Sequence, residues 1–120
     1  MALKTVRLEL ARNSEFPEGS PSRGYEFVAP LDGEGRLDVE EWPAVKGKCT
    51  VRRFWEGEGR DQHGELHHTR HRTWAFSYQP GEDDDEHFFH LDTHSLRVGE
   101  YVSIKETDGR TMTFKIVSVT

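Results

Sequence analysis

Two runs rich in β-forming residues, 100–106 and 110–119, constrain the fold more than any other feature of this chain. Each run alternates apolar and polar side chains, which is the pattern of a half-buried strand. Asp108 and Gly109 lie between them, and Asp-Gly between two such runs is a strong hairpin signal. The sequence therefore predicts an antiparallel β-hairpin at the C-terminal end.

The register of this hairpin follows from its apolar residues. A two-residue turn would put the apolar sets of the two strands on opposite faces, because a shift of one residue inverts every side chain. A three-residue loop at 107–109 instead pairs Ile104 with Met112 and Val102 with Phe114. That loop needs a left-handed residue at its last position, where glycine stands in the sequence.

Alternation recurs along the rest of the chain and predicts further short strands between turn-forming segments. These strands are expected at 5–10, 25–30, 50–56, 65–69, 73–78 and 87–92. About seven short strands predict an all-β domain spanning residues 1–120, either a small antiparallel β-barrel or a sandwich. A barrel is favoured because closure leaves no exposed edge strand.

One short helical turn is expected, at residues 39–42. Asp38 can cap it, and Val39 and Trp42 would face inward three residues apart. Pro43 would then end the turn. The inward members of the alternating strands form the expected core: Val6, Leu8, Phe27, Val51, Trp74, Phe76, Val102, Ile104, Phe114 and Ile116.

Length and charge bound the class of protein. A chain of 120 residues has room for one hydrophobic core. The formal net charge of −6 makes the chain acidic, so general binding to nucleic-acid phosphates or to acidic membranes is disfavoured. Cys49 is the single cysteine, so it has no partner for an intramolecular disulfide and is expected to be a buried apolar filler. Residues 1–10 carry charges, unlike a signal peptide or membrane span, and a cytoplasmic protein is expected.

The histidines suggest one alternative, a divalent transition-metal site. Seven histidines are present, and His87, His90, Asp92 and His94 combine histidine with carboxylate, the ligand type of non-haem iron sites. On one strand, however, residues 90, 92 and 94 would form a line, whereas a metal needs converging ligands. A structural role is therefore favoured, and no cofactor is expected. The neighbouring acidic run, 82–86, does not fit a calcium loop and is interpreted as a solvated charge run.

A second alternative is single-stranded nucleic-acid binding, which mixes cations with aromatic rings. The candidate residues are Arg52, Arg53, Trp55, Arg70, Arg72 and Trp74. Net negative charge and the absence of a nucleic-acid-binding motif argue against this function. Alternation also places Arg52 and Arg53 on opposite faces, so arginine stems that shield aromatic rings are the favoured interpretation.

Segments 1–12, 24–31, 49–55 and 99–104 resemble those of a small conserved bacterial protein family without an assigned function. The resemblance would cover essentially the whole chain and implies a one-domain cytoplasmic protein, with no site residues to carry over. No catalytic motif occurs, so an enzyme is unsupported. The sequence favours a small non-catalytic binding or accessory module. It leaves the ligand open, and with it whether a protein partner or a second copy of the chain is bound.

Overall fold

A computed structural model describes residues 2–57, 61–68, 74–77, 86–89, 95–105 and 110–120. Within these residues eight strands form an antiparallel sheet that closes into a barrel. The strands are β1 (Ala2–Leu10), β2 (Ser20–Leu31), β3 (Thr50–Trp55), β4 (Gln62–His68), β5 (Trp74–Ser77), β6 (Glu86–Phe89), β7 (Tyr101–Lys105) and β8 (Thr111–Val119). The all-β fold is confirmed, and of the two predicted architectures the chain adopts the barrel.

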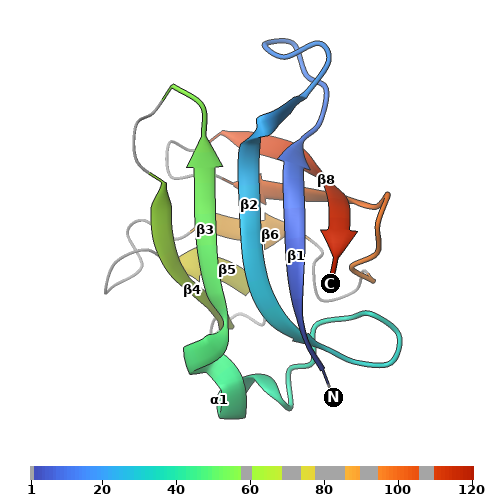
Figure 1. Ribbon diagram of the computed structural model, residues 1–120, viewed down its shortest axis with the longest axis vertical. Coiled ribbons are helices and arrows are strands. Elements are labelled where there is room, and N and C mark those ends of the chain that lie inside the picture. The colour runs from blue at the N-terminus through green and yellow to red at the C-terminus, as the bar shows by residue number, and fades with distance from the viewer. Residues whose placement is uncertain (1, 58–60, 69–73, 78–85, 90–94, 106–109) are drawn as a thin grey trace.

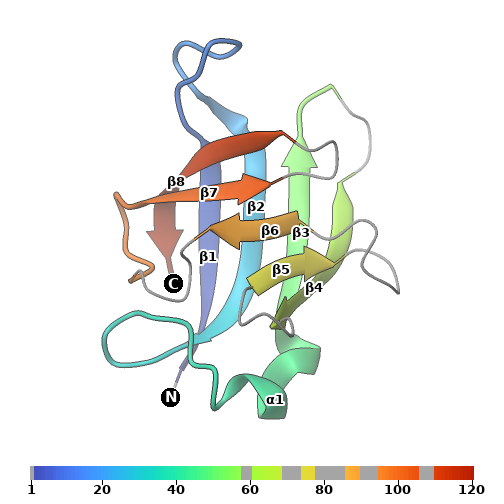
Figure 2. The ribbon, with the colours of Figure 1, turned by 180° about the vertical axis from the view of Figure 1, so that it is seen from behind.

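The barrel has the simplest order, since each strand pairs with the next along the chain (Figure 1). Closure comes from β1 and β8, which run antiparallel from Val6 opposite Val119 to Leu10 opposite Phe114. Seen from behind, β5, β6 and β7 run across the direction of β1, β2 and β3 (Figure 2). Closure of this kind pairs the strand edges that an open sheet would expose.

The C-terminal hairpin has the predicted register. Ile104 pairs with Met112 and Val102 with Phe114, so the apolar residues of β7 and β8 share the inner face. Residues 106–109, which include the predicted loop and Gly109, lie outside the described residues.

The interior of the barrel is packed with side chains. All ten predicted core residues are buried, none more than 5% exposed. At the centre, the Tyr25 ring lies 5.0 Å from that of Phe76 and 5.1 Å from that of Phe114, and Phe27 lies 5.2 Å from Phe76. These spacings are those of favourable tilted and edge-on ring pairs. The aromatic cluster therefore ties β2 to β5 and β8.

The helical turn differs from the prediction. Helix α1 spans Trp42–Val45 rather than 39–42, a 3₁₀ turn (Lys46–Lys48) follows it, and Val39 is 43% exposed. Pro43 lies in the first turn, where its missing N–H costs no hydrogen bond. Trp42 donates its indole N–H to the Leu66 carbonyl at 3.1 Å and meets the Trp74 ring edge-on at 5.9 Å. Helix α1 thus covers one end of the barrel (Figure 1).

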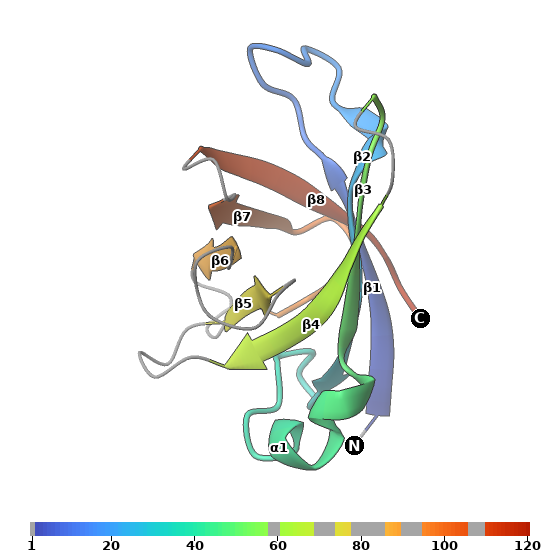
Figure 3. The ribbon, with the colours of Figure 1, turned by 90° about the vertical axis from the view of Figure 1, so that its left-hand side faces the viewer.

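At the other end, the connection between β1 and β2 projects away from the barrel, as the side view shows (Figure 3). The register breaks there, because Glu9 pairs with Gly24 whereas Leu10 pairs with Ser20. Gly24 is buried at this bulge, against the backbone of β1. Glycine is required because a Cβ would overlap the Leu8 carbonyl oxygen and lie 2.9 Å from its carbonyl carbon.

Replacement of this glycine tests the close approach of the two strands. We expect Gly24→Ala to lower the free energy of unfolding by about 3 kcal/mol, because the strands must separate to admit the methyl group. Gly33→Ala is the matched control, since nothing lies within 4 Å of a Cβ there. Urea denaturation measures both, and equal stability of the two variants would contradict the steric explanation.

The aromatic cluster is tested by truncation. Phe76 is fully buried, and Phe76→Ala removes its ring from contact with both Tyr25 and Phe27. We expect a loss of about 3–5 kcal/mol in the free energy of unfolding, from lost burial and the cavity left behind. A loss below about 1 kcal/mol would show that the barrel does not depend on this cluster.

Candidate binding groove

A groove of about 700 Å³ lies on the outside of the barrel, between the base of the β1–β2 connection and the outward-facing residues of β7 and β8. Its size falls within the usual range of ligand pockets, about 300–1,000 Å³. The lining residues come from β1, the β1–β2 connection, β7 and β8. They are Glu9, Leu10, Ala11, Arg12, Glu18, Gly19, Ser20, Pro21, Tyr101, Thr113, Lys115 and Val117.

The floor of the groove is a row of side chains across three strands. Lys115 on β8 pairs with Glu9 on β1 and with Tyr101 on β7, so the three residues are cross-strand neighbours. Tyr101 is 57% exposed, and Lys115 is exposed beside it. The row therefore presents an ammonium group and an aromatic ring on the same outer face.

The β1–β2 connection forms the other wall and is held by local hydrogen bonds. The side-chain carbonyl of Asn13 accepts hydrogen bonds from the backbone N–H groups of Glu15 and Phe16, both at 2.8 Å. Phe16 packs against the core, and the Arg23 guanidinium lies 4.4 Å from the centre of its ring. Phe16 thus anchors the connection to the barrel.

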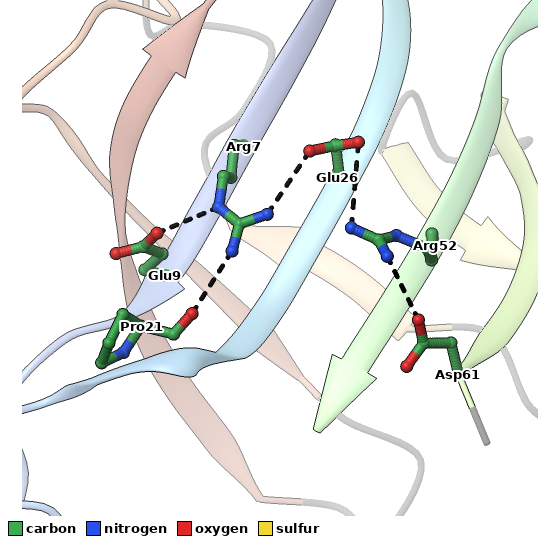
Figure 4. Close-up of polar contacts among 6 residues, drawn as sticks. All are labelled: Arg7, Glu9, Pro21, Glu26, Arg52 and Asp61. Carbon is green, nitrogen blue, oxygen red and sulfur yellow. Dashed lines mark hydrogen bonds and ion pairs between the residues drawn. The ribbon is translucent and has the colours of Figure 1, made fainter. Parts of the chain in front are cut away.

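Next to the groove, the outer face of β1, β2 and β3 carries a chain of alternating charges (Figure 4). Arg7 contacts Glu9 at 2.9 Å and Glu26 at 3.4 Å. Arg52 contacts Glu26 at 3.9 Å and Asp61 at 3.2 Å. Each guanidinium on this face is thus flanked by two carboxylates.

The same two guanidiniums cover an aromatic ring. Arg7 lies 4.4 Å and Arg52 5.2 Å from the centre of the Phe54 ring, which is only 8% exposed although it points outward. Cations over a ring face attract its π electrons, and the arginine stems exclude water. This charge network is therefore part of the stable surface of the barrel, with no cation left over for a ligand.

In the groove, by contrast, two cations lack such partners. Within the part of the chain that the structure describes, neither the Arg12 guanidinium nor the Lys115 ammonium makes a hydrogen bond or ion pair. Both side chains are exposed. Glu9, although it lines the groove, already has its charge matched by Arg7 at 2.9 Å. The groove can accordingly offer positive charge to a ligand.

The structure separates the described members of the predicted nucleic-acid set. Arg53 lies on the inner side of β3, with its guanidinium 4.4 Å from the centre of the Trp55 ring, whereas Arg52 belongs to the outer charge network. Trp74 is 1% exposed inside the barrel, where no base could stack on it. Arg70 and Arg72 lie outside the described residues.

Most of the predicted metal set falls on residues that the structure does not describe. His90, Asp92 and His94 are among these, and for His87 only the backbone is placed, opposite Ala75 and Lys105 in the sheet. Among the described side chains, no group of three or more histidine, cysteine or carboxylate residues could hold a metal ion.

Among the residues that the structure describes, two groups have a shifted pKa, and neither lines the groove. Hydrogen bonds from the backbone N–H groups of Arg36 and Glu34 lower the pKa of the Asp32 carboxyl. Burial raises the pKa of the Cys49 thiol, which is fully buried as the sequence predicts. The Cys49 thiol therefore lacks the exposure and the lowered pKa of a reactive cysteine.

The groove residues are absent from the sequence-based candidates. These residues become neighbours only when β1 pairs with β8. A local sequence pattern does not show which distant strands will pair. One signal was available: Tyr101 alternates with Val102 and Ile104, so the hairpin register alone places its ring outside. An exposed tyrosine on a strand marks a contact surface, because tyrosine is enriched at interfaces.

In comparisons with known proteins, no family model, no curated protein and no solved structure matches this chain. The resemblance to a bacterial family therefore stays a prediction. The described residues also contain no helix with the length and apolar character needed to cross a membrane.

The charge network predicts that Arg7 contributes more to stability than an arginine in an exposed ion pair elsewhere on the surface. Arg7→Met should lower the free energy of unfolding by about 1 kcal/mol, since it leaves Glu9 and Glu26 without their shared cation. Methionine still covers Phe54 with apolar atoms, so the loss of stability comes mainly from the lost ion pairs. Arg36→Met is the control, because its ion pair with Glu34 is about half exposed on the arginine side. Urea denaturation at low and high salt should show that only the Arg7 effect is clearly measurable.

Proposed function

We propose that this protein is a non-catalytic binding module of the cytoplasm that holds an extended ligand in the groove between the β1–β2 connection and strands β7 and β8. One observation supports the proposal: the groove is lined by an exposed aromatic ring and by two cations, Arg12 and Lys115, that make no ion pair or hydrogen bond with the described residues. Elsewhere on the neighbouring face, cations and carboxylates satisfy one another. Unmatched polar groups beside an exposed tyrosine are what a binding surface offers before its ligand arrives.

The interior of the barrel supports an external site. Core positions that would line a ligand cavity are filled by the aromatic cluster and its aliphatic neighbours. Small barrels are commonly filled in this way and then use their outer faces and loops for recognition. The β1–β2 connection, whose residues 11, 12, 18 and 19 line the groove, is held by the Asn13 hydrogen bonds and by Phe16 packed against the core. Order present before binding lowers the entropic cost of binding.

Selection from a random peptide library tests this proposal without assuming a ligand charge. Decapeptides enriched on the wild type should bind Tyr101→Ala at least about tenfold more weakly, as expected for loss of an aromatic anchor. Val39→Ala is the matched control, because Val39 is also an exposed apolar residue but precedes helix α1 by three residues. Helix α1 lies at the other end of the barrel (Figure 1). It should bind the same peptides as the wild type.

Two results would contradict the proposal. One is that no peptide is enriched over a column without protein. The other is that the enriched peptides bind wild type and Tyr101→Ala with equal affinity, which would place the binding surface elsewhere.

A further inference from the structure

We infer that the groove recognises an acidic, extended segment of a partner protein, with Arg12 and Lys115 contacting its carboxylates and Tyr101 contacting its apolar side chains. This inference rests on the proposed function, and it adds the chemical class of the ligand.

The charge of the groove is the first step. Four ionisable side chains besides the tyrosine line it, and among them Glu9 makes an ion pair at 2.9 Å with Arg7, a cation that it shares with Glu26. Arg12, Lys115 and Glu18 remain, so two unmatched cations face one unmatched carboxylate. A ligand with carboxylates gains two charge-assisted contacts, whereas a basic ligand gains one and is repelled twice.

The distribution of charge along the chain is the second step. Five of the six net negative charges are accounted for by the acidic run at 82–86. The rest of the chain is therefore close to neutral, and its charge does not oppose the approach of an acidic segment. Charges beyond about 8–10 Å are screened at physiological salt, so among the described residues those that line the groove act most strongly on a ligand there.

The apolar contact is the third step. Tyr101 is 57% exposed and Val98, three residues before it, is 63% exposed; both precede or begin strand β7. Val117 extends the apolar part of the groove lining. Arg12 belongs to the β1–β2 connection, whereas Tyr101 and Val117 belong to strands β7 and β8. An extended segment in which acidic and apolar residues alternate can turn its carboxylates toward the connection and its apolar side chains toward the strands. An extended acidic-apolar segment therefore fits this surface better than a compact anion.

The test uses a fluorescein-labelled decapeptide of alternating Glu and Val and the matched peptide of alternating Gln and Val. Fluorescence anisotropy should show that the Glu peptide binds the full chain more tightly than the Gln peptide. Its affinity should fall as NaCl is raised from about 50 mM to about 500 mM, because salt screens exposed charge pairs.

Three substitutions are expected to change the affinity for the Glu peptide, two of them lowering it and one raising it. Lys115→Gln and Arg12→Gln should each weaken binding of the Glu peptide about fivefold, the usual upper effect of one exposed charge pair. Glu18→Gln should strengthen it, since a repulsive carboxylate is removed. Lys48→Gln is the matched control: Lys48 is exposed and has no ion pair among the described residues, but it lies beside helix α1. That variant should bind as the wild type does.

The outcomes separate the two proposals. If the Gln peptide binds as tightly as the Glu peptide and Tyr101→Ala weakens both, the groove remains the site and the acidic class is overturned. If the Glu peptide does not bind, or if Lys115→Gln and Arg12→Gln leave its affinity unchanged, the inference fails. Sedimentation of the wild type as a dimer that Lys115→Gln dissociates would also overturn it, because the occupant would then be a second copy carrying the acidic run.

Discussion

Packing of aromatic rings inside the barrel is the interaction on which the rest of the structure depends. Tyr25, Phe76 and Phe114 come from strands far apart in the sequence, and their rings meet within about 5 Å. Because the contacts join β2, β5 and β8, they fix the cross-section of the barrel from the inside. Edge pairing between β1 and β8 then closes the sheet at a diameter that these rings already define.

A filled interior has consequences for function. The described inward-facing side chains pack together at the centre of the barrel, which favours the outer surface for the proposed recognition. Loops and strand faces on that surface differ in how fully their charges are matched. On the β1–β3 face, Arg7 and Arg52 are each held between two carboxylates and over Phe54. The charged groups of this face already form ion pairs with one another, so a partner would add few new contacts there. The groove beside it combines the same rigid strands with cations that have no such partners, so binding there costs no internal ion pair.

The sequence predicted the fold well and the candidate site poorly, for different physical reasons. Alternation along a strand is a local pattern, so it gave the strands, the inward residues and the 102–114 pairing of the last hairpin. The helix begins at Trp42, three residues later than the sequence predicts, because a proline in the first turn is compatible with a helix. Gly24 could not be recognised as a bulge, since its requirement comes from the approach of Leu8 on another strand. Groove residues share that difficulty: Glu9, Lys115 and Tyr101 become a row only after the barrel closes.

The net charge illustrates how a whole-chain property can mislead about a local surface. A formal charge of −6 argues against binding of any anion when it is spread evenly, but here one run of five residues carries most of it. Electrostatic interactions at a surface decay over about 8–10 Å in physiological salt, so recognition responds to nearby charges rather than to the sum. At the groove, Arg7 forms ion pairs with Glu9 and Glu26, whereas Arg12 and Lys115 form none with the described residues. Under the proposed function, the division between paired and unpaired cations among the described residues, rather than the total charge, is therefore the property that would select a ligand.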